Sequence, residues 1–277
     1  MVATTATSSK TGTLPFRTDP PSTSLPTIRE ILFRPLPHLH DRRALRWTIR
    51  LVLLAFRSRI RAVYGAERLA SLSGAVVFAA NHNQRLEAVI LPALLTFLGR
   101  GRNVHFLADW NFIVIPVLGW ILSLNEPIVV VRKDLRPRWL NFMRRWFDDV
   151  PPPMERAALL LRQHSRVGIF PEGTAHRDRN RMLRGLGGAA RLSLECGATV
   201  VPVGLRFRSG PGLGPIRDLE SFEVHIGEPL TPPDLPSPNR RDLLAWNARI
   251  LGTISTLCGK AWSPENPRTR TDDEPTP

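Results

Sequence analysis

The chain of 277 residues contains two cysteines, three lysines and no long apolar run. Cys196 and Cys258 lie in no CxxC or similar pattern, so we expect a reducing compartment and neither a disulfide scaffold nor a structural zinc site. A membrane-spanning helix needs about 20 apolar residues. The longest apolar run, residues 112–124, is interrupted by Pro116 and Gly119, so the sequence predicts no spanning segment.

Both ends of the chain are polar and contain several prolines. Residues 1–28 lack the apolar block of a secretory signal, and we expect them to form a disordered leader. Residues 263–277 have a similar composition and are predicted to form a disordered tail. Between them we expect a basic amphipathic helical segment at 29–64 and a single domain at 65–262, which is long enough to bury a substantial core.

The charge of the chain is strongly positive and is carried by arginine. There are 38 basic and 24 acidic residues, which gives a net charge of +14, and all but three of the basic residues are arginines. Arginine binds phosphate through two parallel hydrogen bonds, so this composition indicates a polyanionic partner, either nucleic acid or an anionic membrane. An arginine-rich composition without functional meaning is the alternative.

Residues 41–63 have the apolar periodicity of an amphipathic helix. Nine arginines and two acidic residues between Arg29 and Arg61 give this stretch a charge of +7, half of the total. The helix either docks on the core with a solvated basic face or lies on anionic lipid, and we expect the second. Nucleic acid is not expected as a partner, because no reading motif occurs. The predicted apolar face comprises Leu45, Ile49, Val52, Leu53, Phe56, Ile60 and Val63, and the basic face comprises Arg43, Arg46, Arg50, Arg57 and Arg61.

Short apolar segments alternate with helical patterns through the rest of the chain. Strands are predicted at 75–80, 128–131, 167–170, 199–203 and 222–226, and helices at 87–98, 139–147, 154–164 and 188–195. This alternation predicts an α/β fold, a mixed sheet flanked by helices. Active sites in such folds gather where the strands end.

The strand at 75–80 is followed by Asn81 and His82, and Glu87 begins the next predicted helix. A carboxylate at that spacing can hold the imidazole in one tautomer and stabilise the imidazolium, which makes a histidine an effective general base. A satisfied polar pair at the start of a helix is the alternative.

The strand at 167–170 is followed by Pro171, Glu172, Gly173 and Thr174, and then by a basic segment. Proline fixes φ and glycine lets the backbone approach a ligand closely, so the loop is suited to binding a phosphate. An ordinary β-turn before a basic surface loop is the alternative. The arginines of the basic segment are Arg177, Arg179, Arg181 and Arg184.

The two loops together resemble the glycerophospholipid acyltransferase family, which includes the lysophosphatidate acyltransferases. The matching features are His82 and Glu87, the stretch 119–132 that ends in IVVVR, the FPEGT sequence at 170–174 and the strand at 200–203, in this order. The resemblance covers about residues 63–228 and implies a glycerolipid acyltransferase-like fold.

The resemblance implies transfer of a fatty acyl group from a thioester of coenzyme A or acyl carrier protein to a lysophospholipid hydroxyl. The acceptor would be a lipid such as 1-acylglycerol 3-phosphate, in phospholipid biosynthesis on the cytoplasmic face of a membrane, with peripheral or monotopic attachment. The acyl thioester is a co-substrate, and no further cofactor or metal is implied. His82 would be the general base, oriented by Glu87. Arg132, Glu172, Gly173 and Thr174 would hold the head group.

The sequence departs from the family pattern at two positions. Glu87 stands where the family has an aspartate, and Ala175 stands where an arginine follows FPEGT, so Arg177 or Arg179 would have to replace that cation. The alternatives are an acyltransferase for a different lysolipid, or a non-catalytic membrane lipid-binding relative. No GxSxG nucleophile is present, and Cys196 is predicted to belong to the core rather than to act as a nucleophile.

Overall fold

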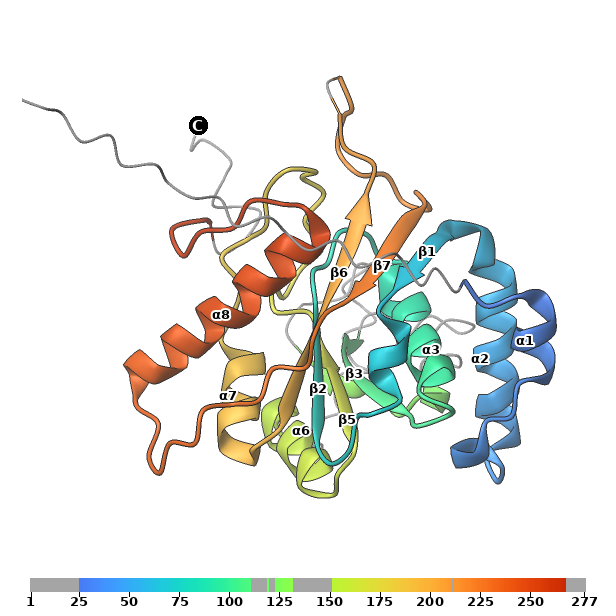
Figure 1. Cartoon of the computed structure of the whole chain (residues 1–277), viewed down its shortest axis with the longest axis horizontal. Helices are drawn as coiled ribbons and strands as arrows, with labels where there is room; N and C mark the ends of the chain where they lie inside the picture. The colour runs from blue at the N-terminus through green and yellow to red at the C-terminus, as the bar shows by residue number, and fades with distance from the viewer. Residues whose placement is uncertain (1–24, 111–118, 120–122, 132–150, 211, 268–277) are drawn as a thin grey trace, which may run out of the picture.

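The computed structural model describes residues 25–110, 119, 123–131, 151–210 and 212–267 (Figure 1). The predicted leader up to residue 24, most of the apolar run at 112–124, the predicted helix at 139–147 and the tail from residue 268 lie outside the described residues.

A seven-stranded sheet forms the centre of the molecule, in the order β1-β7-β6-β2-β5-β3-β4. β6 and β7 are antiparallel, and the other neighbouring pairs are parallel. The strands are β1 (Ile60–Tyr64), β2 (Val76–Ala80), β3 (Val104–Asp109), β4 (Ile128–Val130), β5 (Arg166–Ile169), β6 (Thr199–Phe207) and β7 (Phe222–Ile226). The predicted α/β class with a mixed sheet is confirmed.

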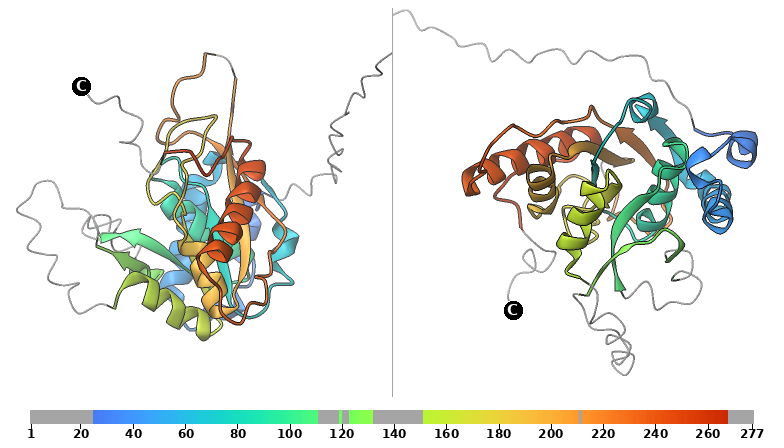
Figure 2. Two further views of the ribbon diagram at one scale, coloured as in Figure 1. Left: turned by 90° about the vertical axis from the view of Figure 1, so that its left-hand side faces the viewer. Right: turned by 90° about the horizontal axis from the view of Figure 1, so that it is seen from below.

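Helices lie on both sides of the sheet (Figures 1 and 2). One side carries α1 (Ile28–Phe33), α2 (Arg43–Phe56) and α3 (Glu87–Leu98), and the other carries α6 (Pro153–Arg162), α7 (Gly188–Cys196) and α8 (Arg240–Cys258). The short 3-10 helices η1 (Pro37–Leu39), η2 (Arg57–Arg59) and η3 (Ala66–Leu69) connect the N-terminal elements.

The central strand β2 shows why the core has two layers. All five of its side chains are buried, as expected of a strand with parallel neighbours and both faces covered. Because side chains alternate along a strand, Phe78 and Ala80 enter the hydrophobic cluster under α2 and α3, whereas Val77 and Ala79 enter the cluster under α6, α7 and α8.

The prediction of one helix over residues 41–63 is wrong in its last part. α2 ends at Phe56, and Ile60–Tyr64 forms β1, which pairs in parallel with β7 at the edge of the sheet. The helical segment predicted at 29–64 therefore ends before β1. Main-chain pairing with a strand about 160 residues away decided this, and the local periodicity could not reveal it.

The predicted basic face of α2 is also not continuous. Arg50 is buried and donates a hydrogen bond from Nη2 to the carbonyl oxygen of Arg34 at 3.1 Å. Its guanidinium lies over the ring of Trp47, 5.3 Å from the centroid. Trp47 and Leu51 are instead half-exposed, so apolar side chains occupy part of the outer face of α2.

Most of the other predicted elements are present, and two elements were not predicted. The sequence did not predict β3, because His105 interrupts its run of apolar residues. α8 has a capping box formed by Asn239 and Asp242 and ends at Gly259 in the left-handed region, and only one face of this helix is buried.

Among the described residues no helix is both long and apolar enough to cross a membrane.

Candidate active site

The loops after β2 and β5 meet because these two strands are parallel neighbours. The chain leaves β2 for α3 on one side of the sheet, and it leaves β5 for α7 on the other side (Figure 1). The carboxyl ends of strands whose connections diverge in this way are where α/β folds bind ligands. His82 lies in the first loop and Glu172 in the second.

His82 and Glu87 form the pair predicted from their spacing. Nδ1 of His82 lies 2.9 Å from Oε2 of Glu87, whose side chain is fully buried. Because Nδ1 is engaged with the carboxylate, Nε2 is the remaining ring nitrogen, and no described residue forms a hydrogen bond with it. The arrangement gives one oriented imidazole with a partner that stabilises its protonated form.

Asn83 fixes the position of the Glu87 carboxylate. Its main-chain N–H donates to Oε2 at 2.7 Å, and its side-chain amide donates to Oε1 at 3.1 Å. The extra methylene of a glutamate, compared with an aspartate, is therefore accommodated by a loop that wraps around the carboxylate. Both oxygens of this buried group have donors.

A series of stacked rings supports the imidazole from the side. The ring of Phe170 stacks on His82 with centroids 4.3 Å apart, and Phe106 contacts Phe170 at 5.2 Å. Phe106 lies directly over Gly168 of β5, where a Cβ atom would overlap its ring. Gly168 thus leaves the space that this series of rings needs.

Residues 170–173 form a tight turn. The N–H of Gly173 donates to the carbonyl oxygen of Phe170 at 2.9 Å, Pro171 occupies the second position, and Gly173 has φ of 68°, in the left-handed region. Gly173 is exposed and Thr174 is half-buried, so this turn is accessible to solvent beside His82.

Glu172 is buried and joins the two loops. Its Oε1 accepts the N–H of His82 and its Oε2 accepts the N–H of Leu183, each at 2.9 Å. Burial raises the pKa of Glu172 from 4.5 to about 6, although these hydrogen bonds and nearby cations act in the opposite direction. A further bond, from the N–H of His176 to the carbonyl oxygen of His82 at 2.8 Å, completes the connection.

The two arginines expected to replace the missing cation at position 175 are both engaged in ion pairs. Arg177 bonds Asp218 at 2.6 Å, and Arg179 bonds both oxygens of Glu220 at 2.7 and 2.8 Å. Arg177 remains partly exposed, whereas the Arg179 side chain is buried. Arg132 lies outside the described residues.

Lys260 is a site residue that the sequence did not reveal. It follows α8, is buried, and its ammonium group donates to the side-chain oxygen of Asn83 and, at 2.5 Å, to the carbonyl oxygen of Asp178. Burial lowers the pKa of Lys260, while Glu172, Cys258 and Glu87 act to raise it. No local signal identifies this lysine, because Asn83 lies 177 residues away in the sequence.

Arg85 is a second cation that was not singled out. It lies between His82 and Glu87, is exposed, and forms no hydrogen bond or ion pair with the described residues. Its position within the histidine loop is visible in the sequence. An exposed guanidinium without a described partner is suited to a phosphate.

Cys196 does not have the surroundings of a nucleophile. It ends α7, its Sγ faces the carbonyl oxygen of Ala158 at 3.9 Å, and burial raises the pKa of its thiol. A thiol with a raised pKa is a poor nucleophile. Groups of three or more metal-ligating side chains do not occur among the described residues.

The family model described as "Acyltransferase" matches residues 60–206 of the chain, which include both loops of the site. The chain is 27% identical over 143 residues to the chloroplastic 1-acyl-sn-glycerol-3-phosphate acyltransferases LPAT1 of Arabidopsis thaliana and BAT2 of Brassica napus. These alignments cover 52% of this chain but only 35% and 36% of the two relatives, so the match spans about a third of their length.

Among solved structures, the fold is similar to that of the 1-acyl-sn-glycerophosphate acyltransferase PlsC from Thermotoga maritima. The TM-score is 0.54 at 18% identity, and the superposition covers 85% of this chain and 87% of that one. At this identity the likeness concerns the fold.

Proposed function

Since this chain belongs to the acyltransferase family, we propose that it transfers a fatty acyl group from a thioester to the free hydroxyl of a lysophospholipid such as 1-acylglycerol 3-phosphate. The donor is an acyl-CoA or an acyl carrier protein thioester, and the reaction serves phospholipid biosynthesis. The observation that carries the proposal is the His82–Glu87 pair, held at 2.9 Å with Nε2 of His82 left to face substrate.

The pair supports direct transfer in two steps. Nε2 of His82 removes the proton of the acceptor hydroxyl while the oxygen attacks the thioester carbonyl, and Glu87 stabilises the imidazolium that forms. When the carbon–sulfur bond breaks, the imidazolium returns the proton to the departing thiolate. The products are an ester and a free thiol, and no acyl-enzyme intermediate is needed.

The loop after β5 is proposed to bind the head group of the acceptor. Gly173 and Thr174 offer main-chain and hydroxyl groups to the acceptor. Arg132 is the cation carried over from the family pattern, and the partly exposed Arg177 would replace the arginine that the pattern has at position 175. Because both oxygens of Glu172 accept main-chain N–H groups, we assign it the role of positioning His82 rather than contacting the head group.

A phosphate-bearing acceptor is supported by Arg85 and by the relatives. Arg85 is exposed in the histidine loop without a described partner, and the two plant relatives are described as 1-acylglycerol-3-phosphate acyltransferases. Arg85 therefore replaces part of the positive charge that the family pattern has at position 175.

Membrane attachment is proposed through α1 and α2, which pack together on one side of the molecule (Figure 2). Four large apolar side chains are exposed on these helices, namely Ile28, Phe33, Trp47 and Leu51. Apolar side chains among arginines are typical of helices that lie in a lipid interface. We propose peripheral or monotopic attachment at the cytoplasmic face.

The proposal is tested by following thiol release from a long-chain acyl-CoA with a panel of lysolipids. We expect release with lysophosphatidate and its loss in His82→Ala, while the exposed His40→Ala serves as a matched control and keeps full activity. Undiminished release in His82→Ala would overturn the assignment of the base. A preference for another lysolipid would overturn the acceptor, and inactivity of the parent with every acceptor and donor would favour the lipid-binding alternative.

A further inference from the structure

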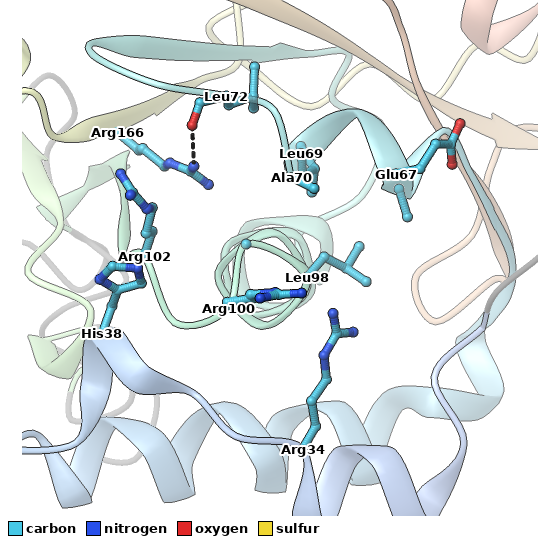
Figure 3. Close-up of a pocket in the computed structure, with 12 residues that line it drawn as sticks. Arg34, His38, Glu67, Leu69, Ala70, Leu72, Leu98, Arg100, Arg102 and Arg166 are labelled. Carbon is cyan, nitrogen blue, oxygen red and sulfur yellow. Dashed lines mark hydrogen bonds between the residues drawn. The ribbon is translucent and has the colours of Figure 1, made fainter.

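A cavity lies away from the candidate active site and has a volume of about 570 Å³ (Figure 3). It is formed by Arg34, which directly follows α1, and by residues from η1, from η3 and the segment after it, from the end of α3 and the segment that leads to β3, and from the start of β5. Its basic lining residues are Arg34, His38, Arg100, Arg102 and Arg166.

This cavity is at the opposite end of the sheet from His82. Arg166 is paired with Val76 at the start of β2, whereas His82 follows the last residue of that strand. α3 runs from Glu87 in the active site to Leu98 beside the cavity, which for 12 residues is about 18 Å. A ligand in the cavity is therefore not bound at the candidate active site.

The cavity has an excess of positive charge at close range. Glu67 is the only acidic residue among those that line it, against four arginines and His38. Figure 3 shows Arg34, Arg100, Arg102 and Arg166 arranged around the same space. Burial and, to a smaller extent, the neighbouring charge of Arg102 together lower the pKa of Arg166 to about 10. Like charges gathered in a partly enclosed space disfavour one another, and a bound anion would compensate them.

Arg166 is the residue that points to a ligand most directly. It is only 4% exposed, its Nη2 donates to the carbonyl oxygen of Leu72 at 3.4 Å, and its Nη1 is buried without a hydrogen-bond partner. A Cβ atom at Gly99 would lie 2.6 Å from this Nη1, so glycine leaves the guanidinium its space beside the cavity. A buried donor without a partner is rare in native proteins and calls for an acceptor.

We propose that this cavity is a second binding site, for a phosphate-bearing anion, distinct from the acyl-transfer site. Guanidinium groups bind phosphate oxygens in a bidentate manner, and the volume accommodates more than a single phosphate group. Bound phosphate would join Arg34 and His38 of the N-terminal elements to Arg100, Arg102 and Arg166 of the core domain.

Two sources supply this chemistry. Arg34 directly follows Phe33, an exposed apolar residue of α1, so a phospholipid head group can reach the cavity when α1 lies on a membrane. A soluble phosphate compound can enter from water. In both cases the anion stabilises the contact between α1 and the core.

The test measures binding of pyrophosphate by calorimetry to the full chain carrying His82→Ala, so that acyl transfer does not interfere. We expect saturable binding that weakens at least about tenfold in Arg100→Gln/Arg102→Gln, because this variant loses charge-assisted bonds to the phosphate oxygens. Both residues are exposed, so folding should be unaffected, and melting temperatures verify this. The matched control is Arg162→Gln/Arg241→Gln, two exposed arginines on α6 and α8.

A vesicle-binding experiment distinguishes the lipid head group from the soluble phosphate compound. Phosphatidylcholine vesicles with and without phosphatidic acid are compared, and pyrophosphate is added as a competitor. If the protein binds vesicles only when they contain phosphatidic acid, and this binding requires Arg100 and Arg102, the ligand is a lipid head group. If the protein binds pyrophosphate but phosphatidic acid does not increase its binding to vesicles, the ligand is a soluble phosphate compound. The proposal is overturned if neither probe binds, or if the cavity variant and the control variant bind both probes equally.

Discussion

The carboxylate of Glu87 accepts hydrogen bonds from the main chain and side chain of Asn83, in addition to contacting His82. The loop is therefore fitted to a glutamate. Replacing it with the aspartate of the family pattern withdraws the carboxylate by one methylene and leaves these donors without close acceptors.

We predict that Glu87→Asp lowers the rate of thiol release about 10²-fold, because a misplacement of about 1 Å at a catalytic centre has effects of that size. The measurement is release of free thiol from acyl-CoA with lysophosphatidate. Glu195→Asp, an exposed pair with Arg191 on α7, is the matched control and should match the parent. A gain in activity in Glu87→Asp would contradict the prediction.

The stability of the folded protein depends on pH through Glu172. Its pKa is raised by burial from 4.5 to about 6, so the folded state binds the proton more tightly than the unfolded state. The contribution of this group to stability is then fully present below about pH 4.5 and is lost as the pH rises through about 6. The loss amounts to about 2 kcal/mol for a shift of this size.

The corresponding measurement is the free energy of unfolding of the parent and of Glu172→Gln as a function of pH. We predict that between about pH 4 and pH 7 the parent loses about 2 kcal/mol relative to the variant, whose residue 172 does not titrate. Curves that stay parallel over this range would show that burial does not raise the pKa of Glu172.

At the scale of elements, α2 and β1 divide a segment that local periodicity assigns to one helix. Ile60 and Val63 are buried, as the helical pattern also requires, but they are buried through a strand paired with β7. Arg50 is turned inward by its bond to the backbone of Arg34. The outer surface of α2 consequently presents Trp47 and Leu51.

We predict that Trp47→Gln/Leu51→Gln weakens flotation with phosphatidylglycerol-containing vesicles by about tenfold or more. Each buried apolar side chain contributes about 1.5–3 kcal/mol on leaving water, so the loss of two is readily measured. The control is Leu159→Gln/Leu244→Gln, which removes two similarly exposed leucines from α6 and α8. An equal loss of vesicle flotation in both variants would mean that α2 contributes no more to membrane binding than α6 and α8 do.

At the scale of the whole molecule, the C-terminal region completes the active site. α8 packs on the sheet and ends at Cys258, which brings Lys260 to Asn83 of the histidine loop. The ammonium group lies among buried carboxylates and a carbonyl oxygen, so it compensates charge that would otherwise be costly to bury.

We predict that Lys260→Met lowers kcat by about tenfold or more, which corresponds to about 1.4 kcal/mol of transition-state stabilisation. KM for the acyl donor should change little, since Lys260 positions the loop and does not contact substrate. Arg241→Met, an exposed change on α8, is the control, and the melting temperature of each variant verifies folding. An unchanged kcat in Lys260→Met would exclude a positioning role.

The sequence by itself determined the α/β class, the pairing of His82 with Glu87 and the turn at Gly173. Those features depend on short spacings, namely buried apolar runs, a turn glycine and a carboxylate five residues after a histidine. Tertiary structure alone decided that residues 60–64 form a strand, that Arg179 is paired with Glu220, and that Lys260 enters the site. It also gathered arginines that follow α1, that follow α3 and that begin β5 around one cavity. The physical reason is that strand pairing and charge compensation join residues far apart in the chain, and no local pattern contains that information.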